Sequence, residues 1–242
     1  MNAMTVVPIP TLIANTYLLR STRCVLVDTG NPGSEQTILR RLAQHGVRPH
    51  DIALILLTHG HVDHIGSAAA LRALTGAPVA IHCRDADALR NGRNPPLRAS
   101  GRSGQVLRLM PFIRRGSPPV EPDIVIDGPF DLSAYGVAGT VLATPGHTPG
   151  SLSVLLPDGD AIVGDLLMGG YAAGKLRPHV PNDHYFIDDL AQARASLRLV
   201  LGHDPQRLYV GHGGPLRPEA VRARFSRALE SDAMQPLGTV SR

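Results

Sequence analysis

The chain has 242 residues, of which 43% are hydrophobic, so it is long enough to bury a substantial core in a single domain spanning 1–242. Its 24 Lys and Arg residues exceed its 20 Asp and Glu residues, and a net charge of +4 is too small to indicate a nucleic-acid-binding protein. No apolar run approaches the length of a membrane span, and no basic, apolar leader opens the chain, so we expect a cytoplasmic location without a membrane partner.

Short apolar runs separated by glycine, proline and aspartate predict the strands of the first third of the chain. They lie at residues 6–9, 17–19, 25–27, 52–57 and 78–82. The run 52–57 is apolar at every position, which is typical of a strand covered on both faces. We expect one helix to begin after a capping residue, Ser34, and to end at Gly46. A second helix should run from about Gly66 to Leu74 and end at Gly76.

The two cysteines, Cys24 and Cys83, stand in apolar, strand-like stretches. Two cysteines in a chain without a secretory leader do not indicate a disulfide framework. We therefore expect two buried free thiols.

The segment Thr58–His64 is the most informative motif, and it follows the buried strand 52–57 directly. Three histidines and one aspartate fall within six residues, and such a cluster is costly to pack unless a cation binds it. His59 and His61 can point one way while Asp63 and His64 point another. Four ligands from one loop therefore suit two adjacent ions better than one.

Residues 90–120 read as an inserted loop with a short helix. No acidic residue lies between Asp87 and Glu121, whereas this stretch holds seven arginines and an apolar block over 106–113. One interpretation is a solvated surface excursion. The alternatives are a lid that contacts an anionic or apolar small-molecule substrate, and a surface for a membrane or nucleic acid.

Three further candidate metal ligands follow strands of the C-terminal half. Strands are expected at residues 124–126, 139–143, 152–156, 161–163 and 208–210. Helices are expected at residues 188–201 and 218–229. His147, Asp165 and His212 each follow a strand, beside glycines that let the backbone approach a site closely. Strands and helices in both halves predict two sheets packed together with helices outside.

Four other polar residues are open to two interpretations. Asp28 is either a turn residue or a support for the metal loop. His179 and His184 either line a substrate cleft or stabilise a loop. His82 is expected to be a satisfied core histidine or a support for a ligand.

The motif His59-x-His61-x-Asp63-His64, followed in order by His147, Asp165 and His212, resembles the metallo-β-lactamase-fold superfamily. The resemblance covers about residues 6–215 and implies an α/β fold, a four-layer αβ/βα sandwich of two mixed β-sheets with helices outside. It further implies two metal sites at one edge of the sandwich. In that arrangement His59, His61 and His147 hold one ion, Asp63, His64 and His212 hold the other, and Asp165 bridges the two.

The ligand set is similar to that of glyoxalase II and lactonases, because His64 is present and no cysteine stands near Asp165 or His212. The resemblance implies a binuclear hydrolase whose bridging hydroxide attacks a small ester, thioester or lactone, with Asp63 as the catalytic proton acceptor or relay. Two divalent ions are expected, zinc as first choice and iron or manganese as alternatives.

Two other activities remain as alternatives. A persulfide dioxygenase of the same fold, with one iron, keeps a very similar set of histidines. A phosphodiester hydrolase acting on nucleic acid has only the arginine-rich insertion in its favour, since aromatic residues for base stacking make up 4% of the chain. The sequence leaves the oligomeric state open, with a homodimer among the alternatives.

Overall fold

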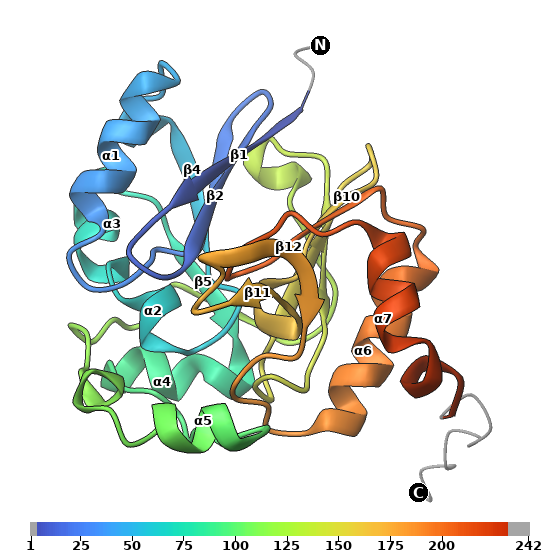
Figure 1. The fold of residues 1–242 in the computed structure, drawn as a ribbon. Coiled ribbons are helices and arrows are strands. Elements are labelled where there is room, and N and C mark those ends of the chain that lie inside the picture. The colour runs from blue at the N-terminus through green and yellow to red at the C-terminus, as the bar shows by residue number, and fades with distance from the viewer. Residues whose placement is uncertain (1–3, 232–242) are drawn as a thin grey trace, which may run out of the picture.

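The computed structural model describes residues 4–231, apart from the side chains of Phe112 and Ser231 (Figure 1). Residues 1–3 and 232–242 of the expected domain lie outside this part. Within it, no helix is both long and apolar enough to cross a membrane.

Two mixed sheets form the centre of the molecule. In the first sheet the order is β1 (Thr5–Pro10), β2 (Asn15–Arg20), β3 (Cys24–Val27), β4 (Ile52–Leu56), β5 (Val79–His82) and β6 (Ile124–Ile126). Strands β1 to β3 pair antiparallel, and β3 to β6 pair parallel. In the second sheet the order is β13 (Arg207–Tyr209), β10 (Asp160–Ile162), β9 (Leu152–Leu155), β8 (Thr140–Ala143) and β7 (Phe130–Asp131). Only β10 and β13 are parallel in this sheet.

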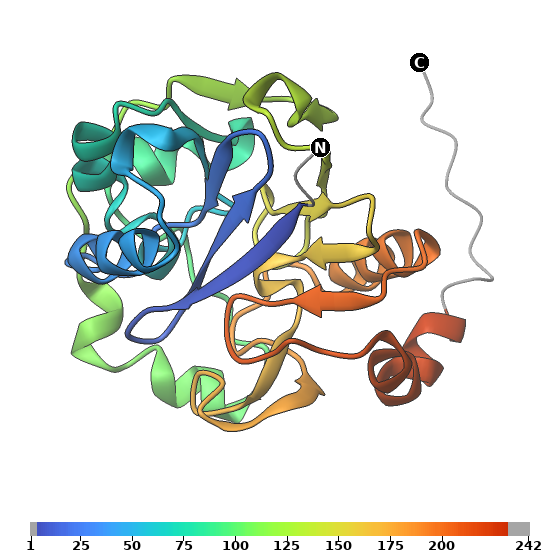
Figure 2. The same ribbon diagram turned by 90° about the horizontal axis from the view of Figure 1, so that it is seen from above.

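Helices cover the outer face of each sheet. Helices α1 (Glu35–Gln44) and α3 (Ala68–Thr75) lie against the first sheet, and α6 (Leu190–Gly202) and α7 (Pro218–Ser231) lie against the second (Figures 1 and 2). The short helices are α2 (Val62–Ile65), α4 (Ala86–Asn91) and α5 (Arg102–Leu107), and a hairpin of β11 (Met168–Tyr171) and β12 (Leu176–Asn182) stands apart from both sheets. The molecule is thus a four-layer αβ/βα sandwich, which confirms the expected fold class.

Three apolar clusters fill the three interfaces between the four layers. Strand β4 shows how one sequence serves two of them. Ile55 and Leu57 belong to the cluster under α1 and α3, while Leu54 and Leu56 belong to the cluster between the sheets. Because side chains alternate along a strand, the unbroken apolar run is what a strand with two buried faces requires.

Two local expectations were correct only in part. Helix α1 begins after Ser34 as expected, but the Ser34 backbone is already helical (φ −78°, ψ −13°) and its side chain makes no capping hydrogen bond. Its N–H instead donates to Ser67 Oγ at 2.9 Å. Both thiols are free, but only Cys24 is buried; Cys83 is partly exposed because it begins a 3-10 turn after β5 rather than lying within the strand.

One edge of the sandwich collects four strand ends. The chain leaves β4 at Leu56, β8 at Ala143, β10 at Ile162 and β13 at Tyr209. A candidate ligand follows each of these ends within a few residues. The architecture therefore brings together segments that are up to about 150 positions apart in the sequence.

Candidate metal centre

The structure brings all seven predicted ligands together at this edge, around the carboxylate of Asp165. The Oδ2 atom of Asp165 lies 3.7 Å from His59 Nε2 and 3.5 Å from His64 Nε2. It lies 3.5 Å from His147 Nε2 and 3.2 Å from His212 Nε2. Asp165 and these four histidines are buried. One carboxylate oxygen therefore faces four imidazoles that come from three segments of the chain: His59 and His64 from the Thr58–His64 segment, and His147 and His212 from two later loops.

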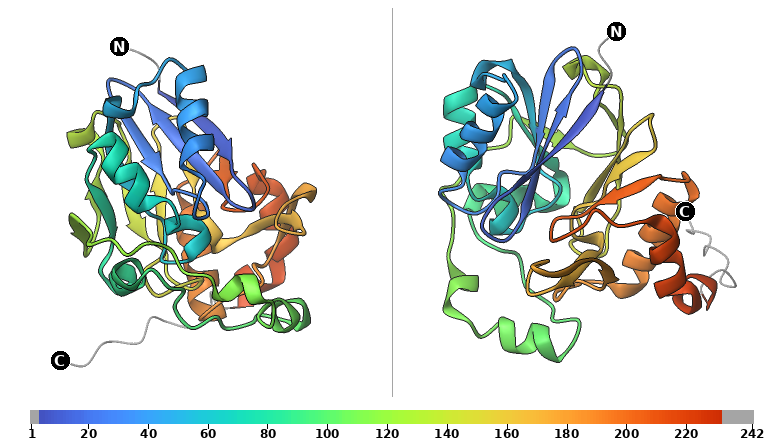
Figure 3. Two further views of the ribbon diagram at one scale, coloured as in Figure 1. Left: turned by 90° about the vertical axis from the view of Figure 1, so that its left-hand side faces the viewer. Right: turned by 45° about the horizontal axis from the view of Figure 1, so that its top comes forward.

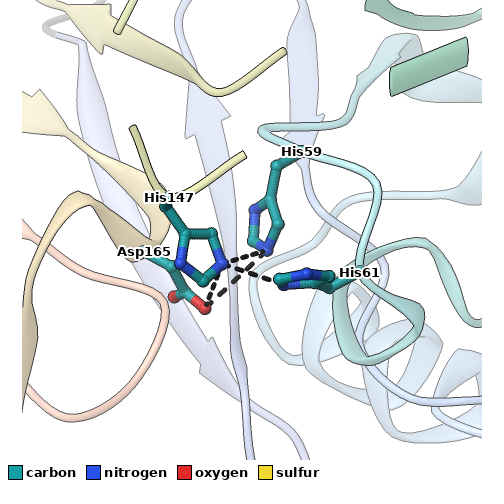
Figure 4. A group of neighbouring side chains, drawn as sticks. All are labelled: His59, His61, His147 and Asp165. Atoms are coloured by element: carbon teal, nitrogen blue, oxygen red, sulfur yellow. Dashed lines mark hydrogen bonds and ion pairs between the residues drawn. The ribbon is translucent and has the colours of Figure 1, made fainter. Parts of the chain in front are cut away.

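The first half of the centre consists of His59, His61 and His147, which converge with Asp165 in Figure 4. The Nε2 atom of His147 lies 3.2 Å from His59 Nε2 and 2.8 Å from His61 Nδ1. The ligand atoms of these four residues all lie within 4.8 Å of one another. A single cation can be shared by such a group.

The second half consists of Asp63, His64 and His212, whose ligand atoms also lie within 4.8 Å of one another. Asp63 and His64 belong to α2, a single helical turn that the sequence analysis did not anticipate. The Oδ2 atom of Asp63 lies 3.4 Å from His212 Nε2, and the Asp63 side chain is 23% exposed. This half is therefore the one that opens towards solvent.

The outer nitrogens of four histidines are held by protein groups. His59 Nδ1 contacts Thr58 Oγ1 at 3.0 Å, His64 Nδ1 contacts Asp28 Oδ2 at 2.8 Å, His147 Nδ1 contacts Phe186 O at 2.8 Å, and His212 Nδ1 contacts Ile13 O at 2.7 Å. The carbonyl and carboxylate partners accept a proton from Nδ1, which leaves the lone pair of Nε2 directed at the centre. This is the usual way in which a protein orients histidine ligands.

Asp28 fulfils both of the roles left open by the sequence. It is a turn residue with a positive φ of 64°. Its carboxylate also accepts hydrogen bonds from Thr58 N at 2.7 Å and Thr58 Oγ1 at 2.8 Å, in addition to its contact with His64. Asp28 therefore joins the start of the metal-binding loop to a histidine of the second half.

Asp85 is a buried residue of the site region that the sequence analysis missed. Its carboxylate accepts from Gly60 N at 2.7 Å, from Gly150 N at 2.9 Å and from Thr148 Oγ1 at 2.6 Å. It thereby ties the loop of His59 and His61 to the loop of His147. No local pattern in the sequence reveals this, because each partner is at least 25 positions away.

His184 also reaches the centre, whereas His179 does not. His184 is buried, its Nε2 lies 3.3 Å from Asp165 Oδ2, and it stacks on His212 with ring centroids 5.2 Å apart. His179 is exposed and contacts Pro215 O at 3.0 Å. His82 is a satisfied buried histidine away from the centre, with Nδ1 accepting from Arg84 N at 3.2 Å.

The imidazoles of the first half are uncharged at neutral pH. Burial lowers the pKa of His59 well below 6.5, that of His61 to about 4 and that of His147 to about 3. Neutral imidazole is the form that binds a metal ion. The first half is therefore ready to accept a cation without losing protons.

The second half is charged. Burial opposes protonation of His212, but attraction to the carboxylates of Asp165 and Asp63 raises its pKa to about 10. The pKa of His64 is likewise raised, because Asp165 and Asp28 outweigh its burial. Burial favours the neutral form of Asp165, yet the surrounding imidazoles hold its pKa well below the usual range.

The donor atoms present fit a divalent cation. His64 Nε2, His212 Nε2 and both carboxylate oxygens of Asp165 are buried without a hydrogen-bond partner among the described residues. Buried polar atoms are rarely left in this state, and nitrogen and carboxylate donors are those that zinc prefers. Gly211 contributes by having no side chain, since a Cβ there would collide with Asp165 Oδ1.

Comparison with known proteins agrees with the geometry. The model of the metallo-β-lactamase superfamily matches residues 9–212. The probable metallo-hydrolase YflN of Bacillus subtilis is 32% identical over 232 aligned residues, covering 87% of this chain and 84% of YflN. A hydroxyacylglutathione hydrolase of Anaeromyxobacter dehalogenans is 29% identical and covers 92% of this chain and 73% of its own.

Solved structures show the same architecture. A metallo-β-lactamase family protein from Thermus thermophilus, TTHA1429, superposes with a TM-score of 0.65 at 26% identity, covering 96% of this chain and 82% of that one. The family model spans most of the chain. Two relatives that align with this chain over most of their own length are named as probable metallo-hydrolases. The chain therefore belongs to the metallo-β-lactamase superfamily and is a metal-dependent hydrolase.

Proposed function

We propose that this protein is a binuclear hydrolase that cleaves a small ester, thioester or lactone. The observation that carries the proposal is the position of Asp165, whose buried Oδ2 lies between two groups of ligand atoms and has no hydrogen-bond partner among the described residues. His59, His61 and His147 would hold one ion, and Asp63, His64 and His212 the other. Asp165 would bridge them.

Zinc is the ion we propose, because the donor set contains only imidazoles and carboxylates. When bound, such ions lower the pKa of water towards neutrality and polarise an acyl carbonyl. Among the described residues, the two groups of candidate ligands contain no cysteine that could act as a nucleophile. The protein's contribution is therefore to hold the ions, to orient the substrate and to move protons.

Asp63 is the residue that we propose to relay the proton. Burial opposes its ionised form, but the polar contact with His212 Nε2 at 3.4 Å and the charge of His64 hold its pKa below the usual range. The carboxylate therefore passes a proton on rather than storing it. Its partial exposure places it at the boundary between the buried centre and solvent.

Acyl substrates are favoured by the relative named as a hydroxyacylglutathione hydrolase, since that name describes thioester cleavage. The site here contains the classes of donor that such chemistry requires, namely imidazoles and carboxylates in groups that could hold metal ions. We therefore propose that this protein also cleaves an acyl substrate, whose leaving group is a thiol or an alcohol.

Metal analysis combined with a substrate panel tests the proposal. The purified protein should contain two zinc ions per chain and should hydrolyse esters, thioesters or lactones. Chelation should abolish turnover and added zinc should restore it. His61→Ala should lose both metal and turnover, whereas the matched control His179→Ala, at an exposed histidine outside the centre, should keep both.

Two results would contradict it. Full activity of a metal-stripped sample would exclude metal-dependent hydrolysis. About one iron per chain, with oxygen uptake on a persulfide substrate, would assign the protein to the dioxygenase alternative instead.

A further inference from the structure

A pocket of about 630 Å³ opens beside the candidate metal centre. Four residues of the centre or next to it form its inner end: His61, Asp63, His184 and His212. Residues of the arginine-rich segment form much of the remaining wall, together with Ala172 and Ala173 of the hairpin turn between β11 and β12. Figure 3 shows this segment, in green, reaching beneath the sandwich towards the hairpin in gold.

The arginine-rich segment is hydrogen-bonded to residues 185–187, which directly follow His184. Ala99 pairs with Phe186 as an isolated β-bridge, Ser100 N donates to Tyr185 O at 3.0 Å, and Ile187 N donates to Arg98 O at 2.9 Å. Gly104 of α5 packs against the carbonyl of Tyr185 so closely that a Cβ would collide with it. The wall therefore has a defined position over the centre.

The wall facing the pocket is apolar. Leu97, Val106, Leu107, Met110 and Ile113 line it. Val106 is 58% exposed and Met110 is 40% exposed, so apolar surface is left facing the pocket. Apolar surface gathered beside a reactive centre is typical of a site that removes an apolar ligand from water.

Two arginines, Arg102 and Arg115, line the same pocket. Neither has an ion pair or hydrogen bond from its side chain within residues 4–231. Other arginines of the segment differ: Arg98 pairs with Asp188 at 2.8 Å and Arg90 with Glu121 at 3.0 Å. Arg102 and Arg115 are thus positive charges beside a largely apolar pocket, and neither forms an ion pair with a described residue, although the Asp63 carboxylate lines the same pocket.

We propose that this pocket selects an acyl substrate with an extended apolar body and an anionic group at the end remote from the scissile bond. The apolar body would lie against Val106, Leu107 and Met110, and the anion would meet Arg102 and Arg115. The reacting carbonyl would then lie at the end formed by His61, Asp63 and His212. This proposal rests on the hydrolase function proposed above and specifies its substrate class.

The segment provides its own control residues. Arg108, Leu109 and Arg114 line a second groove, here called the outer groove, and not the pocket beside the centre. The outer groove adjoins the pocket and shares Leu97, Ile113 and Arg115 with it. Leu109 is 70% exposed, so it is at least as accessible as Val106. Substitutions on the two sides of the same segment should therefore have similar effects on folding and different effects on substrate choice.

Three para-nitrophenyl esters separate the two features of the pocket. The acetate tests hydrolysis alone, the octanoate adds an apolar chain, and the monosuberate adds a terminal carboxylate to a chain of the same length. With zinc-loaded protein, kcat/KM for octanoate should exceed that for acetate by about tenfold or more. The monosuberate should exceed octanoate by roughly threefold to fivefold, and this second advantage should disappear at high salt.

The variants assign each advantage to residues. The pair Arg102→Gln with Arg115→Gln should lower kcat/KM for the monosuberate to the value that the same variant shows for the octanoate, while Arg108→Gln with Arg114→Gln should preserve the monosuberate advantage. Val106→Asp should lower the ratio of octanoate to acetate rates by about tenfold, because a carboxylate in an apolar wall repels the chain, and Leu109→Asp should not.

Distinct results overturn the two levels of the proposal. If acetate and octanoate are cleaved at equal rates, or if the outer-groove variants act like the pocket variants, the substrate class is wrong while the hydrolase function stands. If no ester, thioester or lactone of the panel is cleaved with zinc bound, the proposed function fails. Calorimetry with suberate then still tests the pocket, because binding must be lost in the Arg102 and Arg115 variant and must persist in the Arg108 and Arg114 variant.

Discussion

The two halves of the candidate metal centre meet at Asp165 but differ in burial and in charge. In the first half, burial keeps the imidazoles of His61 and His147 neutral, with pKa values lowered to about 4 and about 3. In the second half, carboxylates raise the pKa of His212 to about 10, and the Asp63 side chain remains partly exposed. The difference teaches that a cation can enter the first half freely but must displace protons from the second.

The largest effect should follow from removing the residue that both halves share. Asp165→Ala leaves His64, His147 and His212 without their common carboxylate, so we expect loss of both ions and a fall in kcat/KM of about a thousandfold or more. Elemental analysis and ester hydrolysis measure the two effects. Retention of two ions would show that Asp165 is not the bridge.

A smaller change at the same place uses Gly211. In Gly211→Ala the new Cβ would collide with Asp165 Oδ1 and push the carboxylate away from its position. We expect a fall in kcat of about a hundredfold with the fold intact, because displacements of about one ångström in a site have effects of this size. Gly202→Ala is the control, since nothing lies within 4 Å of a Cβ there.

A matched pair of isosteric substitutions separates the halves. Asp85→Asn weakens the acceptor that joins the loops of His59, His61 and His147, whereas Asp28→Asn weakens the support of His64. Each should reduce metal affinity by about tenfold to a hundredfold. Asp85→Asn should affect the ion of the first half, and Asp28→Asn should affect the ion of the second half. Stepwise titration calorimetry distinguishes the two sites, and equal effects of both variants on both ions would contradict the division.

Proton release should show the same asymmetry. Near pH 7 the first ion should bind with little release of protons, and the second should release protons from His64 and His212. The affinity for the second ion should therefore rise with pH until about pH 10, by roughly tenfold per unit for each proton displaced. Calorimetry in buffers of different ionisation enthalpy counts these protons, and equal release in both steps would refute the expectation.

The smallest effect concerns the metal-free protein. The pKa of His212 is raised from 6.5 to about 10 on folding, so its stabilisation is full below about pH 6.5 and is lost as the pH rises through 10. The pKa values of His61 and His147 are lowered, so their contribution is present above about pH 6.5 and is lost as the pH falls towards 4 and 3. Urea unfolding across this range should show a maximum of stability between the two limits, and a monotonic profile would contradict it.

The sequence predicted which residues come together at this edge of the sandwich, because these residues carry local signals. His147, Asp165 and His212 each follow a strand end beside glycine, and the apolar run 52–57 alternates between two cores as expected. The hairpin β11–β12 was not predicted, because glycines in β11 and prolines in β12 are typical of loops. β12 nevertheless pairs with β11 at both of its ends, with a register shift between them.

Residues whose partners are distant could not be predicted in the same way. Asp85 acts on Gly60 and Gly150, and His184 reaches Asp165 only after the chain has turned through the hairpin. The arginine-rich segment was recognised from its charge, but which of its arginines face the centre depends on the direction of α5, which Gly104 fixes against Tyr185. Such information lies in the packing of segments and not in any one of them.

The carbonyl of Phe186 has a consequence for the order of events during turnover. It accepts from His147 Nδ1 at 2.8 Å, and Phe186 also pairs with Ala99 at the base of the segment that walls the pocket. A ligand that steadies this segment would steady a metal-bound imidazole through two adjoining backbone contacts. Such coupling is reciprocal: if a bound acyl chain raises the affinity for the ion by some factor, the ion raises the affinity for the acyl chain by the same factor. The metal-free protein would then bind this class of substrate more weakly, and an occupied pocket would slow the escape of the first ion into a chelator.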